Sequence, residues 1–111
     1  MNYKLYYKDL EIGTIVQEDQ DFPNLFGTYK LSDKLKSGHN FINEYIKYSV
    51  EAYALMNKDE QKWLKLVQSE EEKFGELIES EDWKLIDQKG EVHKILIPNF
   101  GNHNEIVWRW G

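Results

Sequence analysis

The last seven residues, EIVWRWG at positions 105–111, constrain the fold more than any other segment. Their alternation of apolar and polar side chains is typical of a β-strand, in which every second residue lies on the same face. Ile106, Trp108 and Trp110 therefore share a face, and the two indoles give that face a large apolar area. We expect both tryptophans to be buried beneath the helices. Core burial is favoured over stacking on nucleic-acid bases because Arg109 lies on the opposite face.

The first 31 residues predict three strands. Residues 3–7 and 10–17 alternate as two strands, with a tight turn at Lys8-Asp9, and together they indicate a hairpin. Residues 18–24 are polar and contain a proline, so we expect a loop there. Residues 25–31 then predict a third, shorter strand.

The predicted second strand contains a glycine in its interior. Gly13 indicates either a bulge or the close approach of another group, because a glycine otherwise weakens a strand. Uninterrupted alternation would place four side chains on one face: Leu10, Ile12, Thr14 and Val16.

The middle of the chain has helical periodicity. After a break over residues 32–40, residues 41–57 carry a broad apolar stripe at 3.6-residue spacing and predict a helix packed on a sheet. The segment 57–60 resembles a capping box that would start a second helix. Residues 59–79 then form either one helix or two short helices meeting near Gln68, and we favour one helix with a kink.

The C-terminal third returns to strands. Residues 83–86, 92–97 and 106–110 predict three of them, and residues 99–104 read as a loop. The order β-β-(β)-α-α-β-β-β predicts an α+β fold, with a mostly antiparallel sheet and two helices packed on one face. A chain of 111 residues is expected to form a single domain over residues 1–111.

Composition narrows the classes of function. The chain contains no cysteine, which excludes disulfides, thiolate metal sites and cysteine nucleophiles. It has no signal-peptide pattern and no membrane-length apolar run, so we expect a cytoplasmic protein. A net charge of −6 opposes binding to nucleic acids and to anionic membranes, but it permits a basic protein partner.

No motif of a known catalytic or cofactor site is present. A nucleophile elbow and a phosphate-binding glycine loop are both missing, and we expect no cofactor. The three histidines, His39, His93 and His103, lack the spacing of a metal site. Asp21 or Glu105 would have to complete such a site, so we predict that no metal binds.

Two groups of carboxylates are candidates for recognition. Asp21 precedes Phe22-Pro23, where the proline restricts the backbone, so its carboxylate would either cap a turn or contact a ligand. Glu71 and Glu72 belong to an acidic stretch over residues 70–79, which is either a solvated helix face or the binding face for a basic partner.

Both ends of the chain carry a pattern found elsewhere. Gly13, then DFP at 21–23, FGTY at 26–29 and the closing VWRW at 107–110 resemble a family of small uncharacterised bacterial proteins. That family has an Asp-Phe-Pro loop and a C-terminal Trp-Arg-Trp strand, with no assigned activity. The resemblance implies a self-contained domain with strands at both ends, and it implies no catalytic residue.

Two functions of different classes follow from these observations. The first is a non-enzymatic protein-interaction domain with an immunity-like or accessory role. A homodimer is compatible with this function. The immunity-like role is suggested by analogy: this chain is similar in size and charge to the small acidic proteins that act as immunity partners of bacterial toxins. The alternative is a small enzyme or small-molecule-binding protein with a cleft near four residues: Asp21, Tyr29, His93 and His103.

Overall fold

The computed structural model describes residues 1–33, 35 and 40–111. The predicted break over residues 32–40, with His39, therefore lies largely outside the described residues. The described elements follow one another in this order: β1 (Asn2–Tyr7), β2 (Leu10–Asp21), β3 (Asn24–Leu31), α2 (Asn40–Met56), α3 (Glu60–Glu70), α4 (Gly75–Glu79), β4 (Trp83–Ile86), β5 (Val92–Lys94), β6 (Asn99–Phe100), the 3-10 turn η1 (Asn102–Asn104) and β7 (Glu105–Trp108).

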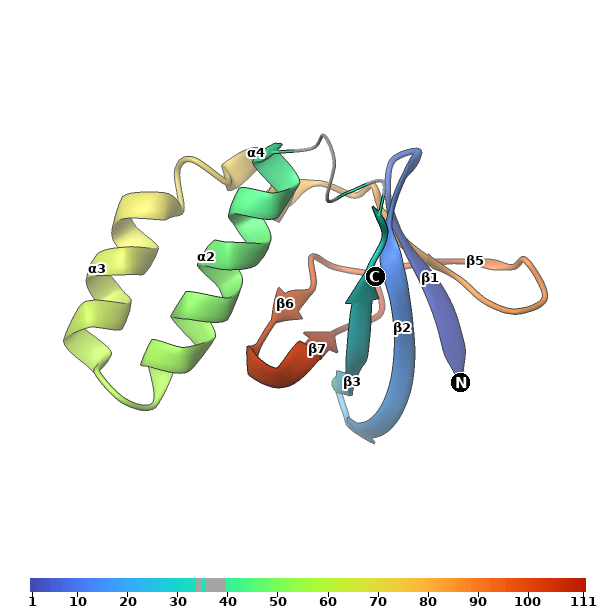
Figure 1. Cartoon of the computed structure of the whole chain (residues 1–111), viewed down its shortest axis with the longest axis horizontal. Helices are drawn as coiled ribbons and strands as arrows, with labels where there is room; N and C mark the ends of the chain where they lie inside the picture. Colours follow the sequence, from blue (N-terminus) through green and yellow to red (C-terminus); the bar gives the residue numbers. More distant parts are fainter. Residues whose placement is uncertain (34, 36–39) are drawn as a thin grey trace.

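The strands form one antiparallel sheet in the order β5-β4-β1-β2-β3-β7-β6. The helices lie together on one side of the strands, with α2 next to them and α3 outermost (Figure 1). The predicted α+β class and its mostly antiparallel sheet are therefore confirmed. Among the described helices, none is long and apolar enough to cross a membrane.

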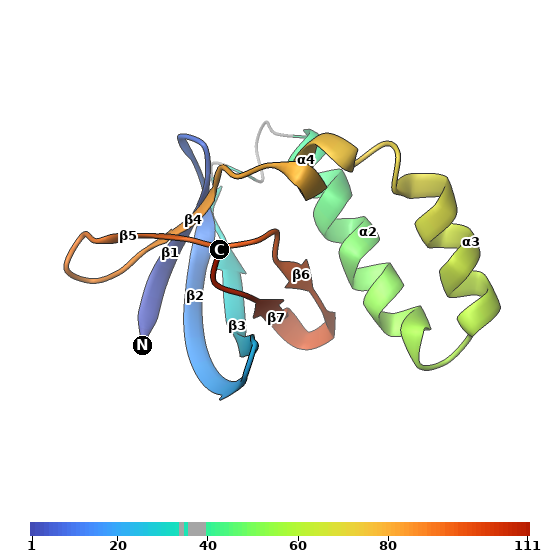
Figure 2. The same ribbon diagram turned by 180° about the vertical axis from the view of Figure 1, so that it is seen from behind.

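The sheet curls until its two sides meet. Beyond β5 and β7, the Leu96 N–H donates to the Arg109 carbonyl and the Gly111 N–H donates to the Lys94 carbonyl, each at 3.0 Å. Ile95 and Trp110 form an antiparallel bridge between these hydrogen bonds. Six described strands, in the order β5-β4-β1-β2-β3-β7, thus close into a ring. The C-terminus lies among the strands (Figures 1 and 2). Closure gives hydrogen-bond partners to backbone that would otherwise form an exposed edge.

A bulge in β2 corrects the predicted face of that strand. Leu5 pairs with Gly13 and Tyr6 pairs with Glu11, so Ile12 is an extra residue in the ladder. Alternation therefore changes phase there: Ile12 and Ile15 are buried, whereas Thr14 and Val16 are exposed. A Cβ atom at Gly13 would overlap the Lys30 carbonyl oxygen, so the glycine also permits the predicted close approach.

The predicted loop over residues 18–24 is instead mostly strand. β2 continues to Asp21 and β3 begins at Asn24, so the chain turns over two residues only. The outer end of β2 is exposed, and polar residues are therefore compatible with pairing there. The sequence pattern did not predict this extension, because residues 18–21 of β2 are exposed on both faces and therefore do not alternate between apolar and polar.

Helix α2 attaches the helices to the sheet. Its buried residues include Ile42, Tyr45 and Ile46, as the predicted stripe requires. The Tyr45 hydroxyl donates to the Pro98 carbonyl at 2.9 Å, and the Ser49 hydroxyl accepts the Phe100 N–H at 2.8 Å. These bonds fix α2 on the residues around β6.

Residues 59–79 form two helices, so the preference for one kinked helix was wrong. Asp59 is the N-cap of α3, with its carboxylate accepting the Lys62 N–H at 3.1 Å. The chain turns between Glu70 and Gly75, which brings Phe74 into the core at 0% exposure. The turn residues are good helix formers, but the burial of Phe74 decides the path of the chain.

The two C-terminal tryptophans have different environments. Trp108 is 1% exposed and pairs with Leu25 across β7 and β3, as expected for a core residue. Trp110 is 44% exposed, so the prediction that both are buried beneath the helices was wrong for Trp110. β7 ends at Trp108, and the chain then leaves β3 to pair with residues 94–96.

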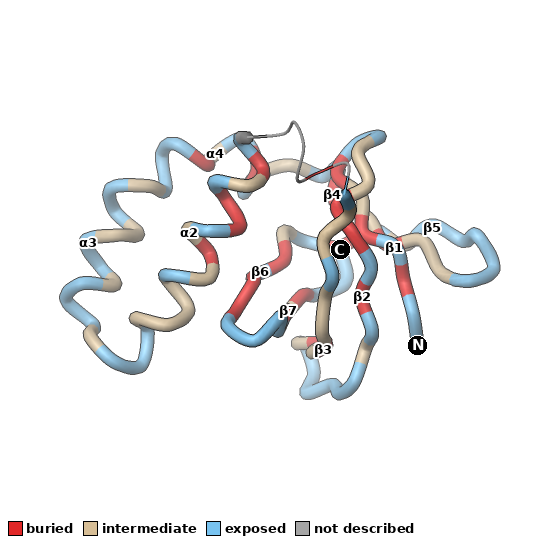
Figure 3. Tube along the Cα trace, viewed as in Figure 1, coloured by how far each residue is buried: buried red, intermediate tan, exposed pale blue. Residues whose placement is uncertain are grey.

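The region between β4 and β7 also departs from prediction. β5 ends at Lys94 instead of residue 97, and residues 99–100, expected in a loop, form the short strand β6. Burial is concentrated inside the ring and on the side of α2 that faces it, whereas α3 has no buried segment (Figure 3).

Candidate functional site

The four residues of the predicted cleft lie on different parts of the fold. Asp21 is exposed at the β2–β3 turn, opposite Asn24. Tyr29 lies on β3 five residues after Asn24, which corresponds to about 16 Å along an extended strand. There its ring packs edge-on against the ring of Phe100. Burial raises the pKa of Tyr29. His103 is an exposed residue of η1.

His93, on β5, belongs to a cluster with Asp87, Tyr3 and Trp110. Its Nε2 donates to Asp87 Oδ2 at 2.9 Å, and its ring packs against those of Tyr3 and Trp110, with centroids 6.2 and 5.7 Å away. This hydrogen bond, assisted by two backbone N–H groups, holds the pKa of Asp87 below its ordinary value.

Asp87, Glu91 and His93 have the ligand types and the proximity of a cation site, since their polar atoms lie within 4.8 Å of one another. Both Asp87 oxygens already have partners, however. Oδ1 accepts the backbone N–H groups of Lys89 and Glu91, each at 2.9 Å, and Oδ2 accepts the His93 proton. The cluster therefore has a structural explanation as a clamp on the turn between β4 and β5. Absence of a bound metal stays a prediction.

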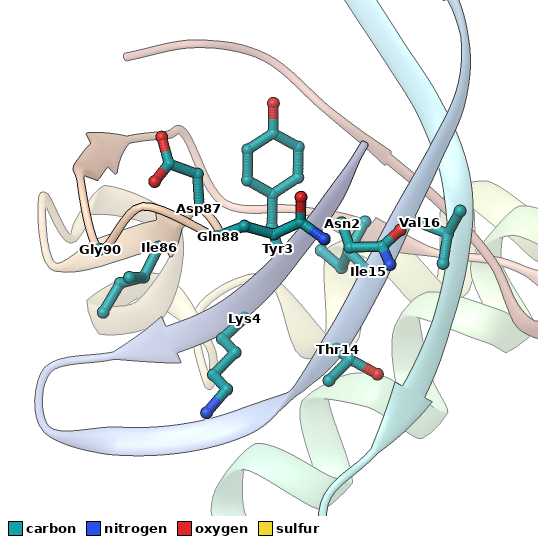
Figure 4. A pocket seen from close by; sticks show the side chains of 10 residues that line it. All are labelled: Asn2, Tyr3, Lys4, Thr14, Ile15, Val16, Ile86, Asp87, Gln88 and Gly90. Carbon is teal, nitrogen blue, oxygen red and sulfur yellow. The ribbon is translucent and has the colours of Figure 1, made fainter.

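A surface cavity of about 550 Å³ lies along β1, β2 and β4. Figure 4 shows that its lining side chains point to opposite sides of the strands: Tyr3 and Asp87 to one side, Lys4 and Thr14 to the other. Small-molecule sites need polar groups that converge on a common point. The divergent lining makes this cavity a weak candidate.

A second hollow, of about 480 Å³, separates the helices from the outer face of β3 and β7, and we call it the helix–sheet groove. Its lining is mostly aromatic and aliphatic. From the helices come Tyr48, Ser49, Ala52, Tyr53, Met56, Trp63 and Val67, and from the strands and their ends come Asn24, Phe26, Asn99 and Val107.

Local periodicity explains how these side chains reach the groove. Phe26 and Val107 are cross-strand partners that point away from the ring interior, where Leu25 and Trp108 are buried. On α3, Trp63 and Val67 are separated by one helical turn and therefore share a face. None of the described side chains of α3 is buried, so this apolar face is incompletely covered.

The groove lies in the negatively charged part of the molecule. Residues 40–82 contain 11 of the 20 acidic residues and 5 of the 14 basic ones, so this segment alone accounts for the net charge of −6. Burial, together with the carboxylates of Glu71 and Glu70, raises the pKa of Tyr48 in the groove wall. Negative potential therefore reaches the apolar lining.

The acidic candidates Glu71 and Glu72 lie beside this region, not on a helix face as predicted. Both are exposed in the turn that follows α3. The Glu71 N–H still donates to the Val67 carbonyl at 2.8 Å, which holds the turn against the end of the helix.

Sequence reasoning recognised most of the groove residues as apolar but did not assemble them. Residues 59–79, which include Trp63 and Val67, were predicted to be helical, and Val107 was placed in the predicted strand over residues 106–110. The apolar face of α3 and the outer face of β7 oppose each other only because of the way the chain runs from α2 to β7. The available signal was the apolar face of α3, which contains Trp63 and Val67 on a helix that is otherwise mostly polar.

Comparison with protein families, curated proteins and solved structures finds no match to this chain. The resemblance to a bacterial family therefore stays a prediction. Two segments of the sequence that carry it, the Asp-Phe-Pro turn and the C-terminal Trp-Arg-Trp segment, lie beside each other in the fold. The Arg109 Nε–H donates to Asn24 Oδ1 at 2.8 Å, so the C-terminal Trp-Arg-Trp segment is joined to the residue after the Asp-Phe-Pro turn.

Proposed function

We propose that this protein is a protein-interaction domain whose partner docks in the helix–sheet groove through an apolar side chain flanked by basic residues. The observation that carries the proposal is the incompletely covered apolar face of α3. Trp63 and Val67 line the groove, and yet no described residue of α3 is buried. Exposed apolar surface rimmed by polar residues is typical of interaction sites.

The weak attachment of α3 supports the same proposal. This helix has 11 residues and packs mainly against α2. Isolated helices of that length are marginal in water, and most helix stability comes from packing of the apolar face. A partner that covers Trp63 would therefore also stabilise α3.

Charge defines the chemistry of the partner. The whole net charge of −6 belongs to residues 40–82, so a basic surface is attracted to the side of the molecule that contains the groove. Attraction of this kind accelerates association and weakens as salt is added. In the immunity-like form of this function, the basic partner is a toxin that the domain neutralises.

A selection from a random-peptide display library tests the proposal. We expect the selected peptides to combine Lys or Arg with a central apolar residue. A synthetic copy should bind at least tenfold more weakly to Trp63→Ala, because Trp63 is an aromatic anchor of the groove. Its affinity should also fall for the Glu71→Lys/Glu72→Lys variant and with rising salt.

Leu64→Ala is the matched control. Leu64 is 43% exposed on the same helix but does not line the groove, so its truncation should leave peptide affinity unchanged. Equal loss in the Trp63 and Leu64 variants, or selection of acidic peptides, contradicts the proposal. A small metabolite that co-purifies with the protein would instead favour a ligand-binding function.

A further inference from the structure

The helix–sheet groove continues across the surface as a chain of smaller hollows. A cavity of about 230 Å³ shares Asn24, Asn99 and Val107 with the groove and extends it to Leu96 and Arg109. Asn24 also lines a third hollow of about 140 Å³. The recessed surface thus runs from Trp63 on α3, past Asn24, to the β2–β3 turn.

The far end of this path is aromatic and exposed. Phe22, at the tip of the β2–β3 hairpin, is 94% exposed, and Trp110 is 44% exposed. Both residues line the third hollow with Pro23. A solvated phenylalanine beside a half-exposed tryptophan forms a second apolar anchor point, separate from the one at Trp63.

Charge at this end matches the charge of the helical segment. Three exposed carboxylates precede the turn: Glu18, Asp19 and Asp21. Among the described residues, Arg109 is the one basic side chain that lines the two smaller hollows, and its Nε–H donates to Asn24 Oδ1. Both ends of the path are therefore negative and apolar, and both suit a cationic partner.

We infer that the partner segment is an extended basic peptide with two apolar anchors, one at Trp63 and one between Phe22 and Trp110. This inference rests on the proposed function. An extended segment can place single side chains into a series of small hollows, here of 230 and 140 Å³, whereas a helix is a cylinder about 10–12 Å in diameter with its side chains. An extended stretch of about 12 residues spans at most about 40 Å, and the path lies within a molecule whose longest dimension is 44 Å.

The four tryptophans make the inference testable by NMR of their indole N–H signals. Trp63 and Trp110 report on the two ends, whereas Trp83 and Trp108, at 0% and 1% exposure, report on the core. The probe is a synthetic peptide of about 12 residues, with leucine second from each end and alternating lysine and serine elsewhere. Half of this peptide, with one leucine, is the single-anchor probe.

We expect the full peptide to shift the Trp63 and Trp110 signals together, with one dissociation constant. The Phe22→Ala variant should bind the full peptide at least tenfold more weakly, whereas the half peptide should still shift the Trp63 signal with the dissociation constant that it has for the wild type. Unchanged Trp83 and Trp108 signals establish that the variant is folded. Val92→Ala is the matched control, since Val92 is 60% exposed and lines none of the three hollows.

The outcomes separate the inference from the proposed function. Shifts at Trp63 alone, with equal affinity in Phe22→Ala, overturn the two-anchor inference and leave the groove as the docking site. Shifts at Trp110 alone would contradict the proposed function, because they would show that the peptide does not dock in the helix–sheet groove. If neither signal moves, or if a peptide with glutamate in place of lysine binds equally well, both proposals fail.

Discussion

Trp108 and Trp110 are two positions apart in a sequence that alternates regularly, yet the fold uses them differently. Trp108 is enclosed by the ring of strands, and its indole N–H has no hydrogen-bond partner among the described residues. Trp110 contacts the rings of Tyr3 and His93, at centroid distances of 6.1 and 5.7 Å, and keeps much of its surface in solvent. One indole serves the core, and the other is available for binding.

Alanine substitutions should separate these two roles. Trp108→Ala should lower the free energy of unfolding by about 3–5 kcal/mol, because it leaves a cavity in the core. Trp110→Ala should cost less than half as much, because the exposed part of its ring contributes no burial. Urea denaturation of both variants measures the difference. Equal losses would show that Trp110 contributes to the core as much as Trp108.

At the scale of elements, α3 differs from the other described α-helices, because none of its residues is buried. The hairpin and the closing strand segments are paired on both sides, whereas α3 has α2 as its main neighbour. An element with little buried surface opens locally at a lower free energy than the core does. Local opening of α3 would widen the helix–sheet groove, so the stability of this helix bears directly on access to the proposed site.

The N-cap of α3 provides a test of that independence. Asp59→Ala removes the acceptor of the Lys62 N–H and should destabilise α3 by about 1 kcal/mol. Amide exchange in α3 should then accelerate about fivefold, while exchange in β1 and β2 stays unchanged. Asp59→Asn retains a side-chain acceptor and is the matched control. Equal acceleration in helix and sheet would mean that α3 opens only with the whole molecule.

The whole molecule is held together by closure of the ring. Residues 94–96 join β4 on one side and the chain end on the other, with Ile95 donating to the Trp83 carbonyl at 3.1 Å. This link places the Trp-Arg-Trp segment beside the β2–β3 hairpin, where Arg109 binds Asn24. The continuity of the proposed binding path therefore depends on a contact between the segments that follow β5 and β7.

A proline at Leu96 tests this closure with little loss of packing, because Leu96 is 52% exposed. Leu96→Pro removes the N–H that donates to the Arg109 carbonyl and should cost at least about 1 kcal/mol beyond Leu96→Ala. The Gly111 amide, which bonds to Lys94, should exchange faster in the proline variant. If its exchange rate matches that of the alanine variant, the ring closure is not a cooperative unit.

The sequence by itself determined the class and order of the elements. Alternation identified β1, β4 and the start of β7, and the 3.6-residue stripe identified α2, because these patterns depend on side chains close together along the chain. The wide apolar face of α2 also indicated correctly that this helix packs on the sheet.

Only the tertiary structure decided how those elements meet. The bulge at Ile12 depends on the register with β1, and the break before Phe74 depends on a site in the core that Phe74 fills. The exposure of Trp110 depends on residues 94–96, and the groove depends on α3 facing β3 and β7. Each of these features is a contact between segments distant in sequence, and local periodicity contains no information about which distant segment will be the neighbour.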